Sequence, residues 1–223
     1  MPDRRPRRFR RACEALSGAL LFVALAGAAR NALVVSGPRP PAPARPASHA
    51  SAQDNGAPAP GAQHADTPAP MAPSTPLRVS IASIKLEAPL LALGADSKGG
   101  PELPPYAMPD TAAWLRDTPT PGAPGAAVLA GHVDTPEGPA VFWKISAVPV
   151  GASVDITRLD GSTATFTVDR VRAFPRSTFP ADLVYAHPSG AELRVVTCGG
   201  TYDRARHEYS DNVVLFAHLT GTH

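Results

Sequence analysis

Residues 157–168 read TRLDGSTATFTV, and this stretch decides the expected fold. Its Asp160-Gly161 pair is a turn signal, because glycine accepts the backbone conformations that tight turns need. From Thr163 to Val168 polar and apolar residues then alternate, which is typical of a strand with one buried face. The stretch therefore predicts a β-hairpin that turns between Leu159 and Thr163.

The surrounding chain repeats such short apolar runs between glycines, prolines and aspartates. We expect strands at 77–84, 88–93, 126–130, 153–159, 163–171, 193–198 and 212–219. Short helical turns fit 111–116, 140–147 and 180–186. None of these turns is long enough to be the crossover helix of a parallel α/β sheet. The fold class is therefore all-β, a mostly antiparallel barrel or sandwich with short helical turns.

The N-terminus predicts a membrane anchor. Residues 1–13 carry a cluster of arginines, and residues 14–35 are mainly apolar. The apolar segment has about 20 residues, roughly the length that crosses the hydrocarbon core. Positive charge before it favours a cytoplasmic N-terminus and an extracellular remainder. We therefore expect a single-pass signal-anchor in the cell membrane; the alternatives are a cleaved signal peptide and, as a weaker match, a twin-arginine signal.

A linker and one folded domain follow the anchor. Residues 36–76 are rich in proline and alanine and nearly lack larger apolar residues, so they cannot offset the entropy cost of folding. Residues 77–223 have the usual size of one domain with a full core. This domain has twelve Lys and Arg against fifteen acids, a net charge of −3, while residues 1–76 carry +5. The domain therefore lacks the positive charge that nucleic-acid binding needs.

Cys198 ends an apolar run and is followed by Gly199 and Gly200, where we expect the strand to stop and to display the thiol. Cys13, the other cysteine, precedes the apolar segment near the N-terminus, so we expect no disulfide within the domain. An unpaired thiol on an exported domain points to a chemical role. In its thiolate form, cysteine is a nucleophile for covalent catalysis.

A histidine beside such a thiol can stabilise the thiolate and later protonate a leaving amine. His132 is the best candidate. It follows the expected strand 126–130 and Gly131, so it stands at a strand end beside a glycine, as Cys198 does. The main rival is His207, in the loop after the cysteine.

Several motifs together carry a family resemblance. They are LAGHVDT at 129–135, VVTCGG at 195–200 with Tyr-Asp at 202–203, YSDNVV at 209–214, and Phe-Pro at 179–180 with Val-Tyr at 184–185. This combination resembles the sortases, most closely the class F or class E-like actinobacterial type. The resemblance covers nearly all of 77–223, and the membrane segment and linker fit it. It implies an eight-stranded β-barrel and a cysteine-type transpeptidase or endopeptidase of the hydrolase class.

The resemblance also implies a mechanism. Cys198 would attack the threonine carbonyl of a Leu-Pro-x-Thr-Gly-like sorting signal and form a thioester. His132 would be the acid for the leaving glycine amine and then the base for the incoming amine. The implied partners are secreted proteins with a C-terminal sorting signal, and an amine from a cell-wall precursor or a pilin.

A third role in the family belongs to an arginine near the last strand. In this sequence Ser210 follows Tyr209 where an arginine is expected, so we assign the role to Arg206, with Arg204 as the alternative. A guanidinium at that place would bind the developing oxyanion. Thr197 is expected to orient the nucleophile or the substrate by hydrogen bonding.

Asp134 follows His132 by two residues, but one histidine and one aspartate are too few ligands for a metal site. We expect neither a metal nor another cofactor. Two other function classes stay open. An L,D-transpeptidase also pairs an exported cysteine with a histidine, although its His-Gly-Cys-Arg-like signature is missing around Cys198. The second is a noncatalytic cell-surface binding module that keeps only the barrel.

Overall fold

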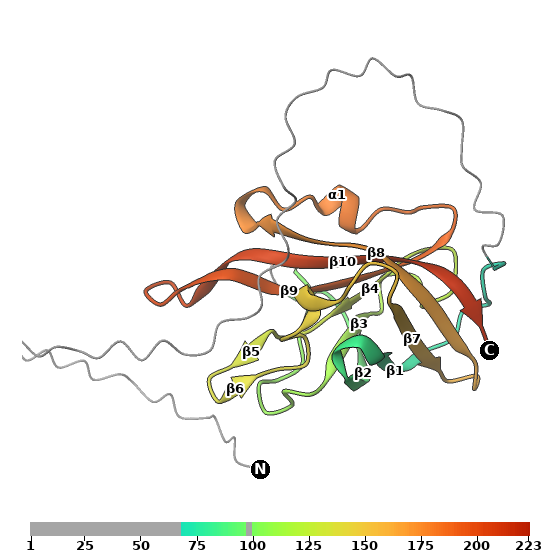
Figure 1. The fold of residues 1–223 in the computed structure, drawn as a ribbon, viewed down its shortest axis with the longest axis horizontal. Helices are drawn as coiled ribbons and strands as arrows, with labels where there is room; N and C mark the ends of the chain where they lie inside the picture. Colours follow the sequence, from blue (N-terminus) through green and yellow to red (C-terminus); the bar gives the residue numbers. More distant parts are fainter. Residues whose placement is uncertain (1–67, 97–99) are drawn as a thin grey trace, which may run out of the picture. The chain divides into compact units, whose positions relative to one another are not determined.

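Eight strands close into one barrel in the computed structural model, which describes residues 68–96 and 100–223 (Figure 1). The strand order around the barrel is β1-β2-β3-β4-β9-β10-β8-β7. The bounds are β1 (Pro76–Ile81), β2 (Leu86–Leu93), β3 (Ala112–Leu115), β4 (Gly125–Ala130), β7 (Ser153–Arg158), β8 (Thr163–Pro175), β9 (Ala191–Asp203) and β10 (Glu208–Thr222). A separate two-stranded sheet joins β5 (Asp134–Thr135) to β6 (Gly138–Pro139). The expected eight-stranded all-β barrel is confirmed.

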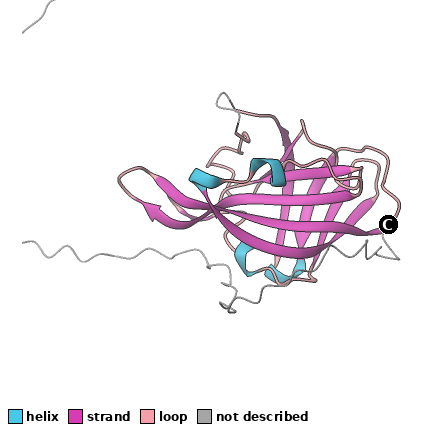
Figure 2. Cartoon of the chain, turned by 90° about the horizontal axis from the view of Figure 1, so that it is seen from above, coloured by secondary structure: helices cyan, strands magenta, loops and turns pink. Residues whose placement is uncertain are grey.

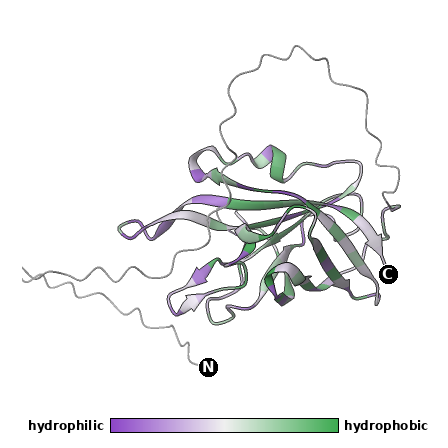
Figure 3. Cartoon of the chain, in the orientation of Figure 1, coloured by the Kyte–Doolittle hydropathy of each residue, from purple (hydrophilic) through white to green (hydrophobic). Residues whose placement is uncertain are grey.

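The hairpin predicted from residues 157–168 joins β7 to β8, with Ile156 opposite Ala164. The alternating apolar side chains of β8, such as Phe166 and Val168, pack into a core that all eight barrel strands share. Complete burial of one large apolar side chain stabilises a fold by about 1.5–3 kcal/mol. Figure 3 shows hydrophobic residues along the barrel strands and hydrophilic residues at the tip of the β9–β10 hairpin.

Helical structure is confined to single turns in the described part of the chain (Figure 2). These turns are η1 (Ala82–Ile84), η2 (Ile145–Ala147), η3 (Arg176–Thr178) and α1 (Ala181–Val184). Two of the expected turns contain η2 and α1, but the helical turn expected at 111–116 is wrong, because β3 lies there. All four residues of β3 are buried between β2 and β4. A strand buried on both faces has no alternation, so its sequence period gives no signal.

A second apolar cluster lies on the outer face of the barrel, below α1. Val196, Val214 and Phe216 supply it from β9 and β10, and Val184 supplies it from α1. Side chains alternate between the two faces of a strand, so the outer face of β9 also carries Cys198. The thiol therefore belongs to the face that α1 covers, not to the barrel interior.

Two strand pairs are parallel, β2 with β3 and β4 with β9. The chain from β4 to β9 passes through β7 and β8, so this crossover needs no long helix. Because parallel strands run in one direction, the C-terminal ends of β4 and β9 open at the same end of the barrel.

Contacts with the barrel begin before residue 77, inside the range expected to be linker. The Met71 N–H donates to the Gly122 carbonyl at 2.8 Å. Arg158, 1% exposed, donates to the Met71 Sδ at 2.9 Å and to the Ala72 carbonyl. The expected anchor at 14–35 lies outside the described residues. In the described ranges, no helix combines the length and the hydropathy of a membrane span.

Candidate active site

The parallel pairing of β4 with β9 places Cys198 and His132 at the same end of the barrel. Ala130 lies opposite Val196, and the ladder continues at Gly131, whose N–H donates to the Val196 carbonyl at 3.3 Å. Both Ala130 and Val196 belong to the outer cluster. Two residues further along their strands, His132 and Cys198 take matching places on the same face. Neighbouring strands are about 4.8 Å apart, so continuing this register by two residues would bring the two side chains close to each other.

Gly131 allows the close packing that holds His132. A Cβ at Gly131 would lie 2.7 Å from Phe142 Cδ2 and 2.8 Å from Val141 Cγ1. The Phe142 N–H donates to the His132 carbonyl at 3.0 Å. The hydroxyl of Thr197 donates to the Gly131 carbonyl at 2.8 Å. Thr197 is buried, so its hydroxyl ties β9 to β4 and does not lie on the open face of the thiol.

The two glycines after Cys198 let the strand bulge, not end. β9 continues to Asp203, which corrects the expected strand end at Gly199. The register shifts here, because Tyr209 pairs with Tyr202 while Asp211 pairs with Gly199. Gly200 has φ +80°, a conformation that side chains disfavour. An extra residue of this kind is a β-bulge, and bulges are frequent beside active sites.

The Cys198 thiol is half-buried and makes no disulfide in the described part of the chain. Burial raises its pKa, the positive charge of Arg176 lowers it, and the carboxylate of Asp134 raises it; burial has the largest effect. The raised pKa means that resting Cys198 is mainly the neutral thiol near pH 7. A nucleophilic thiolate would therefore have to form by giving its proton to a neighbouring base.

The ring of His132 is held by the segment between β2 and β3. Its Nε2 lies 2.8 Å from the Pro104 carbonyl oxygen, and its ring centroid lies 4.5 Å from that of Tyr106. A carbonyl oxygen only accepts hydrogen bonds, so Nε2 carries a proton in this arrangement. In this tautomer the Nδ1 atom carries no proton and is a hydrogen-bond acceptor. No pattern in the sequence marks Pro104 or Tyr106 as a contact of His132.

Asp134 and Tyr209 form a polar contact beside the thiol. The Tyr209 hydroxyl donates to Asp134 Oδ2 at 2.5 Å, which links the β5–β6 sheet to β10. Burial and this bond raise the pKa of Tyr209, so the hydroxyl stays protonated and keeps donating. The sequence placed Asp134 near His132 but gave no partner for it, because the partner lies on a distant strand.

The tip of the β9–β10 hairpin carries the residues that the sequence proposed around 204–207. Arg206 is 79% exposed, with its Nε 3.8 Å from Asp203 Oδ2, and Arg204 is also exposed. His207 is exposed and lies 3.4 Å from the Tyr202 hydroxyl. All three lie beyond the bulge, and the strand pairing sets Asn212, not one of them, opposite Cys198.

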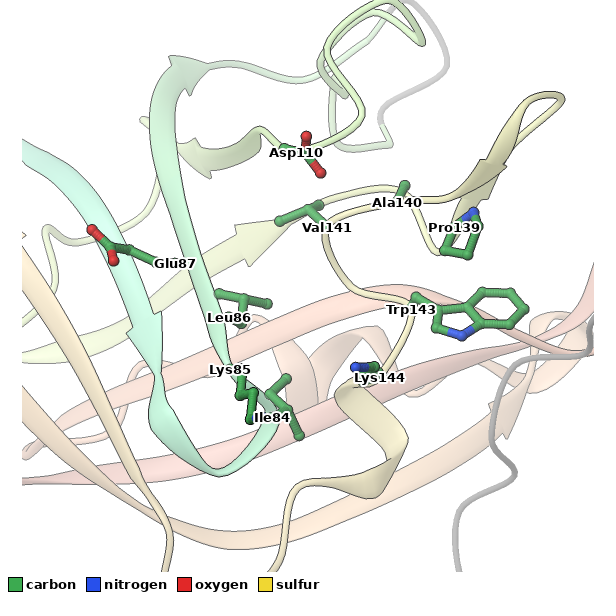
Figure 4. A pocket seen from close by; sticks show the side chains of 10 residues that line it. All are labelled: Ile84, Lys85, Leu86, Glu87, Asp110, Pro139, Ala140, Val141, Trp143 and Lys144. Carbon is green, nitrogen blue, oxygen red and sulfur yellow. The ribbon is translucent and has the colours of Figure 1, made fainter.

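A separate pocket of about 250 Å³ opens between the β1–β2 turn and residues 139–144 (Figure 4). Its lining includes Lys85, Glu87, Asp110, Trp143 and Lys144, and neither Cys198 nor His132 lines it. The lining carries two positive and two negative side chains, so the net charge of the pocket favours neither anionic nor cationic ligands. Residues 68–96 and 100–223 contain no group of three or more His, Cys, Asp or Glu side chains that could hold a metal ion.

Comparison with known proteins gives one family. The family model of the Sortase domain matches residues 79–220. Similar solved structures include sortase A of Listeria monocytogenes, with 17% identity and TM-score 0.50, covering 67% of this chain and 88% of that one. Sortase A of Corynebacterium diphtheriae has 18% identity and TM-score 0.51, covering 71% and 64%. At these identities the structures show a shared fold, and curated protein sequences gave no match.

Proposed function

The chain belongs to the sortase family of cysteine transpeptidases, and we propose that it cleaves a Leu-Pro-x-Thr-Gly-like sorting signal between Thr and Gly. The motifs around the thiol favour the class F or class E-like type. One observation supports the proposal: the β4–β9 pairing ends with Ala130 opposite Val196 on the outer face, and His132 and Cys198 each follow two residues later. A thiol and an imidazole on matching positions of neighbouring strands form the nucleophile and acid–base pair that acyl transfer needs.

The reaction begins with the neutral thiol. The Cys198 proton moves to His132 Nδ1 as the sulfur bonds to the threonine carbonyl carbon. His132 then protonates the glycine nitrogen as the peptide bond breaks, which leaves a thioester on Cys198 and a free amine. In the second half, an incoming amine gives a proton to His132 as its nitrogen displaces the sulfur, and Cys198 regains its proton.

The cellular setting follows from the N-terminal third of the sequence. The apolar segment 14–35 would anchor the chain in the membrane, and the linker 36–76 would hold the barrel outside the cell. The substrates would then be secreted proteins that carry a C-terminal sorting signal. The amine acceptor would be a cell-wall precursor or a pilin lysine.

Peptide turnover by the purified full chain tests the proposal. Peptides of the Leu-Pro-x-Thr-Gly and Leu-Ala-x-Thr-Gly type are incubated with an amine acceptor, and products are identified by mass. We expect cleavage between Thr and Gly, and joining of the amine to the threonine. Cys198→Ala should abolish turnover, and His132→Ala should lower it by about 10²- to 10⁴-fold.

His207→Ala is the matched control, because His207 is the rival histidine and is exposed at the hairpin tip. It should leave turnover within about twofold of the wild type, as expected for a surface position. If no peptide is cleaved, and Cys198→Ala also leaves surface display of proteins unchanged in cells, the chain is a noncatalytic module and the proposal is wrong.

A further inference from the structure

Ser210 occupies the position at which the last strand is expected to carry an arginine. Its hydroxyl makes a structural hydrogen bond. The Thr201 N–H donates to the Ser210 Oγ at 3.0 Å. This bond closes the bulge at Gly200, where an added Cβ would lie 2.3 Å from the same Oγ. Ser210 therefore serves the backbone of β9, and a neutral hydroxyl in this place supplies no positive charge to the thiol.

The register of three neighbouring strands sets a different arginine near Cys198. Cys198 pairs with Asn212, and Asn212 pairs with Phe174 on β8, so these residues form one row across the sheet. Phe174 packs on the outer cluster, which shows that this row faces outward. Arg176 follows Phe174 by two residues, immediately after the pairing of Pro175 with Asp211.

The separation is within reach of a long side chain. Two strand spacings of about 4.8 Å and two residue rises of about 3.4 Å place the two Cα atoms about 12 Å apart. The arginine side chain covers more than half of that distance, and its charge acts on Cys198, lowering the pKa of the thiol. Continuing the register by one residue also places Arg176 next to Ser210, the position without an arginine.

The guanidinium of Arg176 is held weakly. Its Nη1 lies 3.7 Å from Glu208 Oε2, with the two side chains 45% and 54% exposed. Exposed ion pairs of this kind contribute little, so a substrate oxygen can replace Glu208 at small cost. By contrast, Arg170 and Arg194 on the same face lie over the ring of Phe216, at 4.1 and 4.8 Å from its centroid.

We propose that Arg176, at the end of β8, is the guanidinium that binds the acyl oxygen of the sorting signal while Cys198 attacks it. The inference rests on the proposed function. The threonine carbonyl oxygen gains negative charge as the sulfur–carbon bond forms, and a permanently charged N–H donor stabilises that charge without transferring a proton. When the thioester forms, the charge disappears and the guanidinium returns to Glu208.

Single substitutions in the full chain test this assignment by peptide turnover. Arg176→Ala should lower kcat by about 10²- to 10³-fold, the loss typical of removing one oxyanion donor. Arg176→Lys should recover only part of it, because an ammonium lacks the planar fork of the guanidinium. Arg172→Ala is the matched control, from the same face of β8, and should stay within about twofold. The proposal is overturned if Arg176→Ala keeps kcat while Arg206→Ala or Arg204→Ala loses it.

A second readout needs no peptide and therefore separates this inference from the proposed function. The rate at which iodoacetamide alkylates Cys198 is measured against pH for the wild type and each arginine variant. Arg176→Ala should move the profile to higher pH, because a charge that favours the thiolate is gone. Arg206→Ala, Arg204→Ala and Arg172→Ala should leave the profile unchanged. A profile that moves with one of these three variants but not with Arg176→Ala overturns the assignment.

Discussion

Substitution of Gly131 by alanine tests whether the packing below His132 sets the geometry of the proposed pair of His132 and Cys198. The added Cβ would meet the Phe142 ring at 2.7 and 2.8 Å and Val141 Cγ1 at 2.8 Å. Phe142 is fully buried in the barrel core, so its ring has little freedom to withdraw. The segment 139–144 must therefore move away from β4, or β4 must move toward β9.

The expected magnitudes follow from these contacts. Overpacking a core by one methyl group costs about 1–3 kcal/mol of the free energy of unfolding. A displacement of about 1 Å in a catalytic group lowers the rate by about 10²-fold. Gly131 directly precedes His132 and accepts the Thr197 hydroxyl bond, so the displacement reaches the imidazole. Gly131→Ala should therefore lower kcat by about 10- to 100-fold, more than its loss of stability explains.

Urea denaturation and peptide turnover measure the two effects on the same protein. Gly190→Ala is the control, because an added Cβ there has no atom within 4 Å and should change neither quantity. Trimming the obstructing ring by Phe142→Leu in the Gly131→Ala background should restore part of kcat. Wild-type turnover and stability in Gly131→Ala would refute the view that close packing at this glycine positions His132.

Three further predictions concern the surroundings of the thiol. Asp134→Asn removes a charge that raises the pKa of Cys198, so alkylation at pH 7.5 should become about threefold faster, while Glu137→Gln should not change it; equal rates in both would contradict the assigned electrostatics. Tyr106→Ala removes a ring contact worth about 0.5–1.5 kcal/mol, so kcat/KM should fall by about 2- to 10-fold with the alkylation rate of Cys198 preserved, and an unchanged kcat/KM would show that His132 needs no such support. Burial raises the pKa of Cys198 in the folded state above the usual value of about 8.5, so its contribution to stability is complete below that pH and declines above it; urea titrations should show the free energy of unfolding falling more between pH 8 and 10 in the wild type than in Cys198→Ala, and parallel curves would contradict this.

The sequence predicts the parts of the proposed site that depend on local motifs. Cys198 and His132 each follow an apolar strand, and each has a glycine beside it, so single motifs were enough to select them. The β7–β8 hairpin could also be predicted, because its turn and its alternation of polar and apolar residues lie within twelve residues. Strand β3 was missed, since its four buried residues have no polar face to reveal their period.

The contacts that depend on register could not be predicted. Arg206 is close to Cys198 along the chain, and for that reason the sequence suggested it. The bulge at Gly200 shifts the pairing of every residue beyond it in the hairpin, so Arg206 lies farther from Cys198 than its sequence position suggests. Arg176 lies 22 residues before the thiol and reaches its neighbourhood only through the pairings of β8 and β10. Tyr209 and Asp134 meet in the same way, from elements that no local pattern connects.

Trapping of the acyl-enzyme tests the central claim most directly. The full chain is mixed with a Leu-Pro-x-Thr-Gly-type peptide without an amine acceptor, quenched in acid, and its intact mass is measured. We predict a hydroxylamine-sensitive adduct that retains the peptide up to threonine, mapped to Cys198 and missing in Cys198→Ala. A chain whose Cys198 reacts with iodoacetamide, yet forms no adduct with any Leu-Pro-x-Thr-Gly- or Leu-Ala-x-Thr-Gly-type peptide, would contradict this mechanism.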